Sequence, residues 1–246
     1  MSQALYDRIG VGYSEYRRPD ERIANRIDGA LGQARSVLNV GAGAGSYEPN
    51  SRFVLAVEPS AEMIRQRSGT AAQSIRASAD RLPFPDRSFD AVLAILTIHH
   101  WPHRDQGLAE MRRVARDSVV IFTWDPEYPG FWLVQDYLPE ILEIDRPSFP
   151  SLRDIEEAIG PTEVQTLRVP ADCRDGFLGA YWRRPEAYLD ARVRGAISAF
   201  SKVDSASGIA SLRRDIHDGT WRGRYGALLS LAELDVGYRL VIARRA

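Results

Sequence analysis

Short runs of apolar residues, each closed by turn-forming residues, recur through the first half of the chain. They lie at residues 37–40, 53–57, 90–97 and 118–123. Runs of this length are typical of strands that are buried on both faces of a parallel sheet, which helices must then cover. The pattern therefore predicts an α/β fold with a doubly wound, mostly parallel sheet.

The segments between these runs have the spacing of amphipathic helices. Ser60 is placed to cap a helix that carries Met63 inward, and a second helix is predicted to start at Asp105. A third helix begins at Ser151 and ends where Gly160 interrupts the pattern. Strands and helices thus alternate along the chain, as they do in parallel βα units.

Two more strands are predicted at residues 163–169 and 237–244. Between them, residues 171–231 have a mostly helical pattern and cannot belong to the sheet. This segment is rich in aromatic residues, namely Phe177, Tyr181, Trp182, Tyr188, Phe200, Trp221 and Tyr225. These rings either pack together as a helical cap, or some of them line a pocket above the strand ends, where open α/β sheets bind ligands.

The turn after the first strand is rich in glycine, with Gly41, Gly43 and Gly45 separated by alanines, and the second strand ends at Glu58. Glycine has no Cβ and adopts positive φ, so a ligand can lie directly against its backbone. A carboxylate at the tip of the second strand can accept hydrogen bonds from both hydroxyls of a ribose. Together these features predict a nucleoside-containing cofactor at the carboxyl edge of the sheet.

The residues between the two strands decide which cofactor is favoured. Only residues 46–52 separate the last glycine from the second strand, and Pro49 interrupts them. They leave room for about one helical turn, which is a poor dipole for a pyrophosphate. Ser46 also stands where the dinucleotide pattern G-x-G-x-x-G has its third glycine. The pattern therefore favours S-adenosylmethionine, which carries no phosphate, over the NAD(P) of an oxidoreductase, which stays the alternative.

Four segments, taken in order, resemble the class I S-adenosylmethionine-dependent methyltransferases. Residues 37–46 resemble the family's first motif, and residues 56–60 (Ala-Val-Glu-Pro-Ser) resemble its ribose-binding segment. Residues 77–90 resemble its Gly-Asp-Ala-Glu-x-Leu-Pro-Phe segment, and residues 96–101 the segment after the fourth strand. The resemblance implies a seven-stranded Rossmann-like sheet whose last two strands are antiparallel, and methyl transfer from S-adenosylmethionine to a small molecule. A non-catalytic S-adenosylmethionine-binding accessory protein would keep the same motifs.

The resemblance also implies a layout for the chain. We expect one domain over residues 1–246, with an N-terminal arm and helix at 1–33 and a cofactor-binding core at 34–125. The helical lid would be the insertion at 171–231, before the last strand. Such a lid makes chemical sense, because the transferred methyl group must be shielded from water and aligned with its acceptor.

The same resemblance implies a cofactor site at the strand ends and the turns beside them. Its residues would be Gly41, Ala42, Gly43, Gly45, Glu58, Pro59, Met63, Ser78, Ala79 and Leu96. One of them departs from the family, because Ser78 stands where an aspartate usually contacts the adenine. Its hydroxyl can still accept a hydrogen bond from the adenine amino group, but without charge. Ala79 would offer its backbone N–H to the adenine ring.

The N-terminal arm resembles that of many small-molecule methyltransferases, with Tyr6, Tyr13 and Tyr16 followed by Arg17. In those proteins the arm closes over the cofactor, and an arginine can pair with the carboxylate of its methionine moiety. Of the adjacent Arg17 and Arg18, the resemblance favours Arg17 for that role. The alternative is an amphipathic arm that only covers the edge of the sheet.

Candidates for the chemistry follow the fourth and fifth strands. His100 is a general base or substrate-orienting group, since an ordinary histidine pKa of about 6.5 suits proton transfer at neutral pH. The alternative is that one imidazole of the pair His99 and His100 only braces the loop. Asp125 either receives a cationic acceptor or caps the following segment. Trp101 and Trp124 could turn a ring face toward the sulfonium or pack in the core.

Composition excludes several classes of partner. The net charge of −1 gives no field that would gather nucleic acid, and no apolar run approaches the length of a membrane span. The single cysteine, Cys173, allows no internal disulfide and no cysteine metal cluster, and the histidines lack a third ligand at a recognisable spacing. We therefore expect a cytoplasmic protein with no metal, no nucleic acid and no membrane among its partners.

Overall fold

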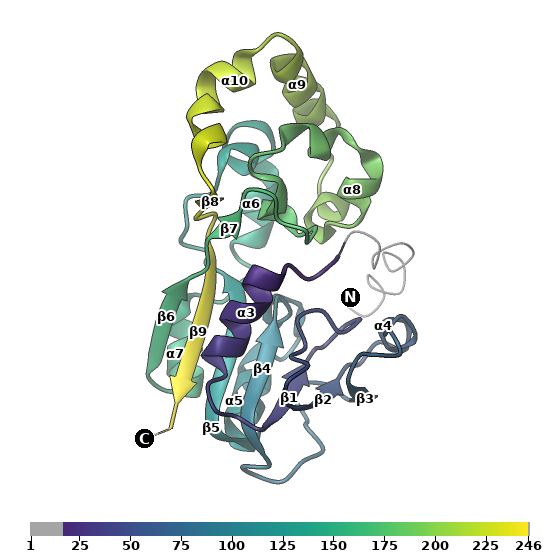
Figure 1. Ribbon diagram of the computed structural model, residues 1–246, viewed down its shortest axis with the longest axis vertical. Coiled ribbons are helices and arrows are strands. Elements are labelled where there is room, and N and C mark those ends of the chain that lie inside the picture. Colours follow the sequence, from purple (N-terminus) through teal and green to yellow (C-terminus); the bar gives the residue numbers. More distant parts are fainter. Residues whose placement is uncertain (1–16, 246) are drawn as a thin grey trace.

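Seven strands form one sheet in the order β3–β2–β1–β4–β5–β9–β6 in the computed structural model, which describes residues 17–245 (Figure 1). The strands are β1 (Ser36–Val40), β2 (Phe53–Val57), β3 (Gln73–Ile75), β4 (Phe89–Ile95), β5 (Ala115–Trp124), β6 (Thr162–Thr166) and β9 (Tyr238–Arg244). Only β9 runs against its two neighbours, β5 and β6, while every other neighbouring pair is parallel. The structure confirms the predicted mostly parallel sheet and the antiparallel pairing of the last two strands.

Helices cover both faces of the sheet, as a parallel sheet requires (Figure 1). They are α3 (Glu21–Ala30) on one face and α5 (Arg104–Val114) and α7 (Leu152–Ile159) on the other. Successive side chains of a strand point to opposite faces, so Val37 of β1 packs in the cluster that holds Ile27 of α3. Its neighbour Leu38 packs in the cluster that holds Met111 of α5. The apolar side chains of β1 are therefore divided between two hydrophobic cores, one on each face of the sheet.

Local signals set the ends of the helices. The hydroxyl of Ser60 accepts a hydrogen bond from the amide of Met63 (3.3 Å) and caps the short helix α4 (Ala61–Arg65). Ser151 and Asp154 form a reciprocal capping box at the start of α7, and Gly160 with φ of 90° ends that helix. These caps are where the sequence predicted them. Residues 41–52 contain turns but no helix, so the room for about one helical turn after β1 is not filled by a helix.

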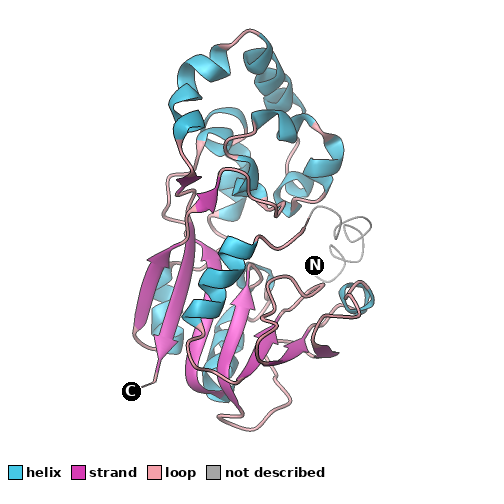
Figure 2. Ribbon diagram, viewed as in Figure 1, coloured by secondary structure: helices cyan, strands magenta, loops and turns pink. Residues whose placement is uncertain are grey.

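A lid of short helices stands on the carboxyl edge of the sheet (Figures 1 and 2). It contains η3 (Leu178–Tyr181), η4 (Pro185–Leu189), α8 (Ala191–Gly195), η5 (Ser198–Lys202), α9 (Ala206–His217), α10 (Thr220–Tyr225) and η6 (Gly226–Ser230). The short strands β7 (Val169–Pro170) and β8 (Glu233–Leu234) pair at its base. They close the insertion at both ends.

A second segment, which the sequence pattern left unassigned, completes the lid. It follows β5 and contains the π-helical turn η2 (Leu133–Tyr137) and α6 (Pro139–Asp145). The hydroxyl of Tyr137 donates to Asp215 of α9 at 3.0 Å, which joins the two parts. Contacts of this kind are invisible in sequence periodicity because their partners are far apart in the chain.

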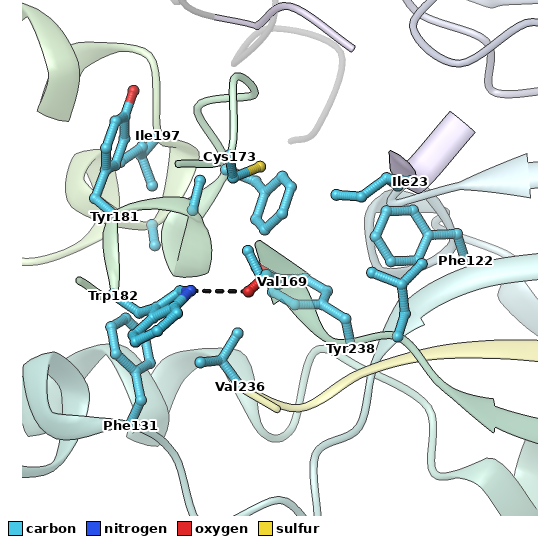
Figure 3. Close-up of a cluster of buried hydrophobic side chains, with 14 of the residues drawn as sticks. Ile23, Phe122, Phe131, Val169, Cys173, Tyr181, Trp182, Ile197, Val236 and Tyr238 are labelled. Atoms are coloured by element: carbon cyan, nitrogen blue, oxygen red, sulfur yellow. Dashed lines mark hydrogen bonds between the residues drawn. The ribbon is translucent and has the colours of Figure 1, made fainter. Parts of the chain in front are cut away.

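Buried aromatic side chains bind the lid to the sheet. The indole N–H of Trp182 donates to the carbonyl of Val169 at the lid base (2.9 Å), and Tyr238 of β9 lies between the lid and Phe122 of β5 (Figure 3). Trp132 in turn donates to the carbonyl of Trp182 at 2.7 Å. Buried indoles with a satisfied N–H favour one well-defined packing. The lid is thus fixed relative to the strand ends.

Within residues 17–245, no helix combines the length and apolar character needed to cross a bilayer.

Candidate active site

A cavity of about 190 Å³ lies at the carboxyl ends of β1, β2 and β4. Its lining includes ten of the eleven residues predicted to contact a cofactor, namely Arg17, Gly41, Ala42, Gly43, Glu58, Pro59, Met63, Ser78, Ala79 and Leu96. Gly45 is the exception and does not line the cavity, because it faces Ala71 and Glu48 behind the turn. We call this space the cofactor cavity.

The glycine turn forms one wall of the cofactor cavity, and its backbone needs glycine. Gly41 has φ of 68°, and a Cβ there would collide with Oγ1 of Thr97. Gly43 has φ of 52°, and a Cβ would lie 3.3 Å from Cε of Met63. Both angles belong to the left-handed region that side chains disfavour. The turn therefore presents bare backbone to the cavity.

Glu58, at the end of β2, holds the turn in place. Its Oε2 accepts from the amide of Gly43 (2.8 Å) and its Oε1 from the amide of Ser60 (2.9 Å). Burial raises the pKa of this carboxyl group, and the two amide donors oppose the rise. A carboxylate offers about four acceptor positions, so each oxygen keeps one for a ribose hydroxyl.

A buried ion pair braces the turn from behind. Arg67 reaches both oxygens of Glu48 through Nη2 (2.7 and 2.8 Å), and the two side chains are only 5% and 6% exposed. Nη1 of Arg67 also donates to the carbonyl of Gly43 at 3.0 Å. The sequence analysis missed this pair because neither residue belongs to a recognisable motif. Its geometry makes both residues positioning groups for the glycine turn.

On the opposite wall, the carboxylate missing at position 78 is available two residues later. Asp80 lines the cofactor cavity, and the hydroxyl of Ser78 donates to its Oδ1. This hydrogen bond lowers the pKa of Asp80 and keeps it ionised. The sequence analysis did not consider Asp80, although it stands inside the segment that resembles the family.

A second cavity, of about 90 Å³, lies between the lid and the ends of β4 and β5. We call it the lid cavity. Most of its wall is apolar or aromatic, including Trp124, Phe131, Phe149, Phe177, Ile197 and Tyr238. Of the seven aromatic residues singled out in the insertion, only Phe177 lines it. Buried Tyr181, Tyr188 and Trp221 pack on one another or on Trp132, and buried Trp182 belongs to the same hydrophobic cluster, as the cap interpretation expects.

The two cavities share three wall residues, Arg17, Leu96 and His100. Leu96 has φ of 48°, an unusual angle for a leucine, and its amide donates to the carbonyl of Phe122 at 2.8 Å. Strained backbone of this kind clusters at functional sites, because the surrounding structure must hold it. The junction of the cavities is thus built on a strand end that the sheet holds in place.

Both adjacent histidines line the lid cavity, and His100 alone also lines the cofactor cavity. The ring of His99 stacks on Phe149 at 3.9 Å between centroids. Burial, together with the nearby charges of Lys202 and Arg17, lowers the pKa of His100 to about 3. Burial also holds the pKa of His99 well below its usual value. Both rings are therefore neutral at physiological pH. Their lowered pKa values differ from the ordinary value of about 6.5 that the sequence analysis used for His100.

Asp125 lines neither cavity. Its Oδ1 accepts from the amide of Glu127 (3.0 Å), and its Oδ2 faces Nε of Arg239 at 3.5 Å. This is the capping arrangement that the sequence analysis held open, so we leave Asp125 out of the proposed chemistry. The two tryptophans differ as well, since Trp101 lines the cofactor cavity and Trp124 the lid cavity.

Arg17 is the first described residue of the N-terminal arm, and Tyr6, Tyr13 and Tyr16 lie outside the described residues. Its Nε pairs with Oδ1 of Asp175 at 2.7 Å. Asp175 belongs to the lid insertion and is nearly inaccessible to solvent. Arg17 is thus held at the junction of the two cavities by the lid.

Comparison with known proteins gives a match at 34% identity along nearly the whole chain. A putative methyltransferase from an antibiotic biosynthesis pathway of Anabaena variabilis is 34% identical, with a TM-score of 0.84, over 93% of this chain and 98% of that one. The methyltransferase-domain family matches residues 38–123.

Two further relatives are similar to less of this protein: one matches a short segment of its sequence, and the other matches only its fold. The ubiquinone/menaquinone biosynthesis C-methyltransferase UbiE of Burkholderia mallei is 39% identical over 64 residues, which are 24% of this chain and only 26% of that protein. The geranyl diphosphate C-methyltransferase of Streptomyces coelicolor A3(2) is 16% identical, with a TM-score of 0.52, over 92% of this chain and 79% of that one. The second likeness concerns the fold alone.

Proposed function

This chain belongs to the class I S-adenosylmethionine-dependent methyltransferases, and on that basis we propose that it methylates a small-molecule acceptor held in the lid cavity. The observation that carries the proposal is the shared wall of Leu96 and His100. Together with Arg17 these residues line both cavities, so a donor in one cavity and an acceptor in the other would meet beside them. That geometry supplies the alignment on which displacement at a methyl carbon depends.

The cofactor cavity has the donor set that S-adenosylmethionine needs. Glu58 keeps free acceptor positions for the ribose hydroxyls, and Asp80 offers a carboxylate to the adenine amino group. Gly41 and Gly43 of the turn line this cavity with backbone that has no room for a side chain. Arg17 lines this cavity beside the junction, where its positive charge attracts the methionine carboxylate. The absence of a helix in residues 41–52 argues against a dinucleotide.

When bound, S-adenosylmethionine would supply an electrophilic methyl group, with its sulfur as a neutral leaving group that keeps the electron pair of the broken bond. The protein positions the acceptor and excludes water. Neutral His100 can accept a hydrogen bond from the acceptor and then the proton that the methylated atom releases. Its low pKa makes it a weak base, so it acts after the bond to carbon has begun to form.

Titration calorimetry tests the cofactor assignment with four ligands: S-adenosylmethionine, S-adenosylhomocysteine, NAD and NADP. We expect micromolar binding of the first two only. Gly43→Val should abolish that binding, because the new side chain meets Met63 and occupies the cavity wall. Gly69→Ala is the control, since nothing lies within 4 Å of a Cβ at that position. Tight NAD binding without S-adenosylmethionine binding would overturn the proposal.

Turnover separates an enzyme from a non-catalytic binding protein. Radiolabelled methyl groups should move from S-adenosylmethionine into an organic-extractable product when small phenols and enols are offered, and S-adenosylhomocysteine should form in equal amount. The Gly43→Val variant gives the background. Cofactor binding with no transfer to any acceptor would favour the accessory-protein alternative.

We also propose that the protein works in the cytoplasm and does not act on nucleic acid. Two features support this, the near-zero net charge and a single buried cysteine whose pKa is raised to about 12 by burial. Binding to a DNA duplex that persists in physiological salt would contradict it.

A further inference from the structure

The charged groups of the lid cavity are balanced within the protein. Among the described residues, the charged side chains in its lining are Arg17, Asp145 and Lys202. Nζ of Lys202 lies 2.9 Å from Oδ1 of Asp145, and Nε of Arg17 lies 2.7 Å from Oδ1 of Asp175 just behind the wall. Each cation therefore has its own carboxylate, and the two histidines are neutral.

An acceptor that carried a net charge would disturb this balance. An anion would compete with Asp145 for Lys202, and a cation would compete with Lys202 for Asp145. In either case one partly buried charge, 13% to 22% exposed, would lose its partner. Uncompensated charges in such surroundings are strongly disfavoured. The charge arrangement therefore selects against charged acceptors.

The remaining wall fits an apolar body. Rings of Trp124, Phe131, Phe149 and Phe177 and aliphatic side chains such as Ile141 surround the space. The Lys202–Asp145 ion pair is set into this wall beside Arg17 and the two histidines, and Lys202 lies near enough to act on His100. An ammonium can donate a hydrogen bond and a carboxylate can accept one. A hydroxyl group is the substituent that satisfies both at once.

We propose that the acceptor is an uncharged, ring-containing molecule whose single hydroxyl group lies against the Lys202–Asp145 pair, at the edge of the lid cavity that adjoins His100. This inference rests on the proposed methyltransferase function, and it adds the class of substrate. Lys202 and Asp145 come from η5 and α6, the two parts of the lid that are separate in sequence. They are specificity-determining residues, and neither lines the cofactor cavity.

Three matched probes test the charge preference: 4-ethylphenol, which is neutral near neutral pH, 4-ethylbenzoate, which is an anion, and 4-ethylbenzylamine, which is a cation. Their affinities are measured with S-adenosylhomocysteine bound. We expect the phenol to bind at least about tenfold more tightly than either charged probe. Equal or tighter binding of a charged probe, or binding of none of them, overturns the inference. Binding of S-adenosylhomocysteine is a separate readout, so the proposed function can stand when this inference fails.

Single substitutions in the Lys202–Asp145 pair should change which charge the lid cavity prefers in a bound probe, and the two substitutions should do so in opposite directions. Asp145→Asn leaves Lys202 without its carboxylate, so the benzoate should gain affinity relative to the phenol. Lys202→Met leaves Asp145 without its cation, so the benzylamine should gain instead. The double variant should prefer the phenol again. A control is the exposed pair Arg153–Glu157 on α7, where Arg153→Gln should leave all three affinities unchanged. Identical responses of both single variants would show that the pair has only a structural role.

The position of the probe can be checked directly. Lys202 is the only lysine of the chain, so reductive methylation with carbon-13 formaldehyde labels it and the N-terminus alone. The dimethylated amine keeps its charge. Its resonance should shift when 4-ethylphenol binds, and the Asp145→Asn/Lys202→Met double variant, which has no lysine to label, identifies that resonance by its absence. An unchanged Lys202 resonance during saturable phenol binding contradicts the proposed contact.

Discussion

Arg17 and Asp175 are joined by a 2.7 Å ion pair that links the start of the described chain to the lid insertion. The other carboxylate oxygen of Asp175 accepts a hydrogen bond from the hydroxyl of Tyr47 at 2.8 Å. Tyr47 directly follows the glycine turn and is itself buried. A single buried carboxylate thus connects the arm, the cofactor turn and the lid. The orientation of Arg17 toward the cofactor cavity depends on it.

Asp175→Asn should weaken binding of S-adenosylhomocysteine by about tenfold or more, because Arg17 loses the partner that aims it. Binding of 5′-methylthioadenosine, which lacks the amino-acid part, should change little. Arg17→Met should likewise weaken binding of S-adenosylhomocysteine and leave binding of 5′-methylthioadenosine nearly unchanged. Tyr47→Phe keeps the ion pair and is the control. Calorimetry decides the question, and tighter S-adenosylhomocysteine binding in Asp175→Asn would mean that Asp175 competes with the cofactor for Arg17.

Glu58→Ala should lower cofactor affinity and stability together. The carboxylate accepts two backbone amides and would accept two ribose hydroxyls, and hydrogen bonds to charged groups are worth about 1.5–3 kcal/mol each. We expect loss of more than about a hundredfold in S-adenosylhomocysteine affinity. Glu58→Gln keeps the acceptor oxygen toward one amide and should retain more stability. A folded Glu58→Ala protein with unchanged affinity would place the ribose elsewhere.

Asp80→Asn tests the carboxylate that replaces the expected one at position 78. Removing its charge should weaken S-adenosylhomocysteine binding by about tenfold, whereas Ser78→Ala should have a smaller effect because it removes only a hydrogen bond to Asp80. Asp86→Asn, on the exposed loop further along, is the control. A larger effect of Ser78→Ala than of Asp80→Asn would return the adenine contact to Ser78.

The buried ion pair Arg67–Glu48 should contribute far more to the free energy of unfolding than the more exposed pair Arg65–Glu62 nearby. Breaking a buried pair leaves an uncompensated charge and costs about 3–5 kcal/mol in the free energy of unfolding, so Arg67→Ala should destabilise the protein strongly. Arg65→Ala, at the end of α4 and two residues before Arg67, should cost about 1 kcal/mol or less. Denaturant unfolding measures both values. Similar losses in the two variants would show that the brace is not needed.

The lowered pKa of His100 predicts a specific dependence on pH. The unfolded chain binds a proton near pH 6.5, whereas the folded protein resists protonation until about pH 3. Between these values the unfolded state holds more protons, so the free energy of unfolding should fall as the pH drops through that range. His100→Asn should flatten this slope, and the exposed His217→Asn should not. Activity should show no acidic limb from His100 between about pH 5 and 8.

Loss of activity with an apparent pKa near 6.5 that disappears in His100→Asn would contradict this environment for the ring. So would an NMR titration of His100 in the same range. Either result would restore the simpler assignment of His100 as an ordinary general base.

Local patterns determined the parts of this protein that depend on neighbours in sequence. The strands β1 and β2, the caps at Ser60 and Ser151, and the glycine turn could all be predicted from the sequence. Each rests on short-range physics: side-chain alternation, satisfaction of helix-end amides and positive φ at glycine. The cofactor cavity follows from them, because parallel strands bring their carboxyl ends to one edge.

Only the tertiary structure decided which distant side chains meet. Asp175 lies 158 positions from Arg17, Lys202 lies 57 positions from Asp145, and Arg67 lies 19 from Glu48. It also decided protonation, since burial beside Lys202 and Arg17 keeps His100 neutral, although its residue type predicts a switch near neutral pH. Charge pairing and desolvation depend on the three-dimensional surroundings of a group, which no local pattern contains.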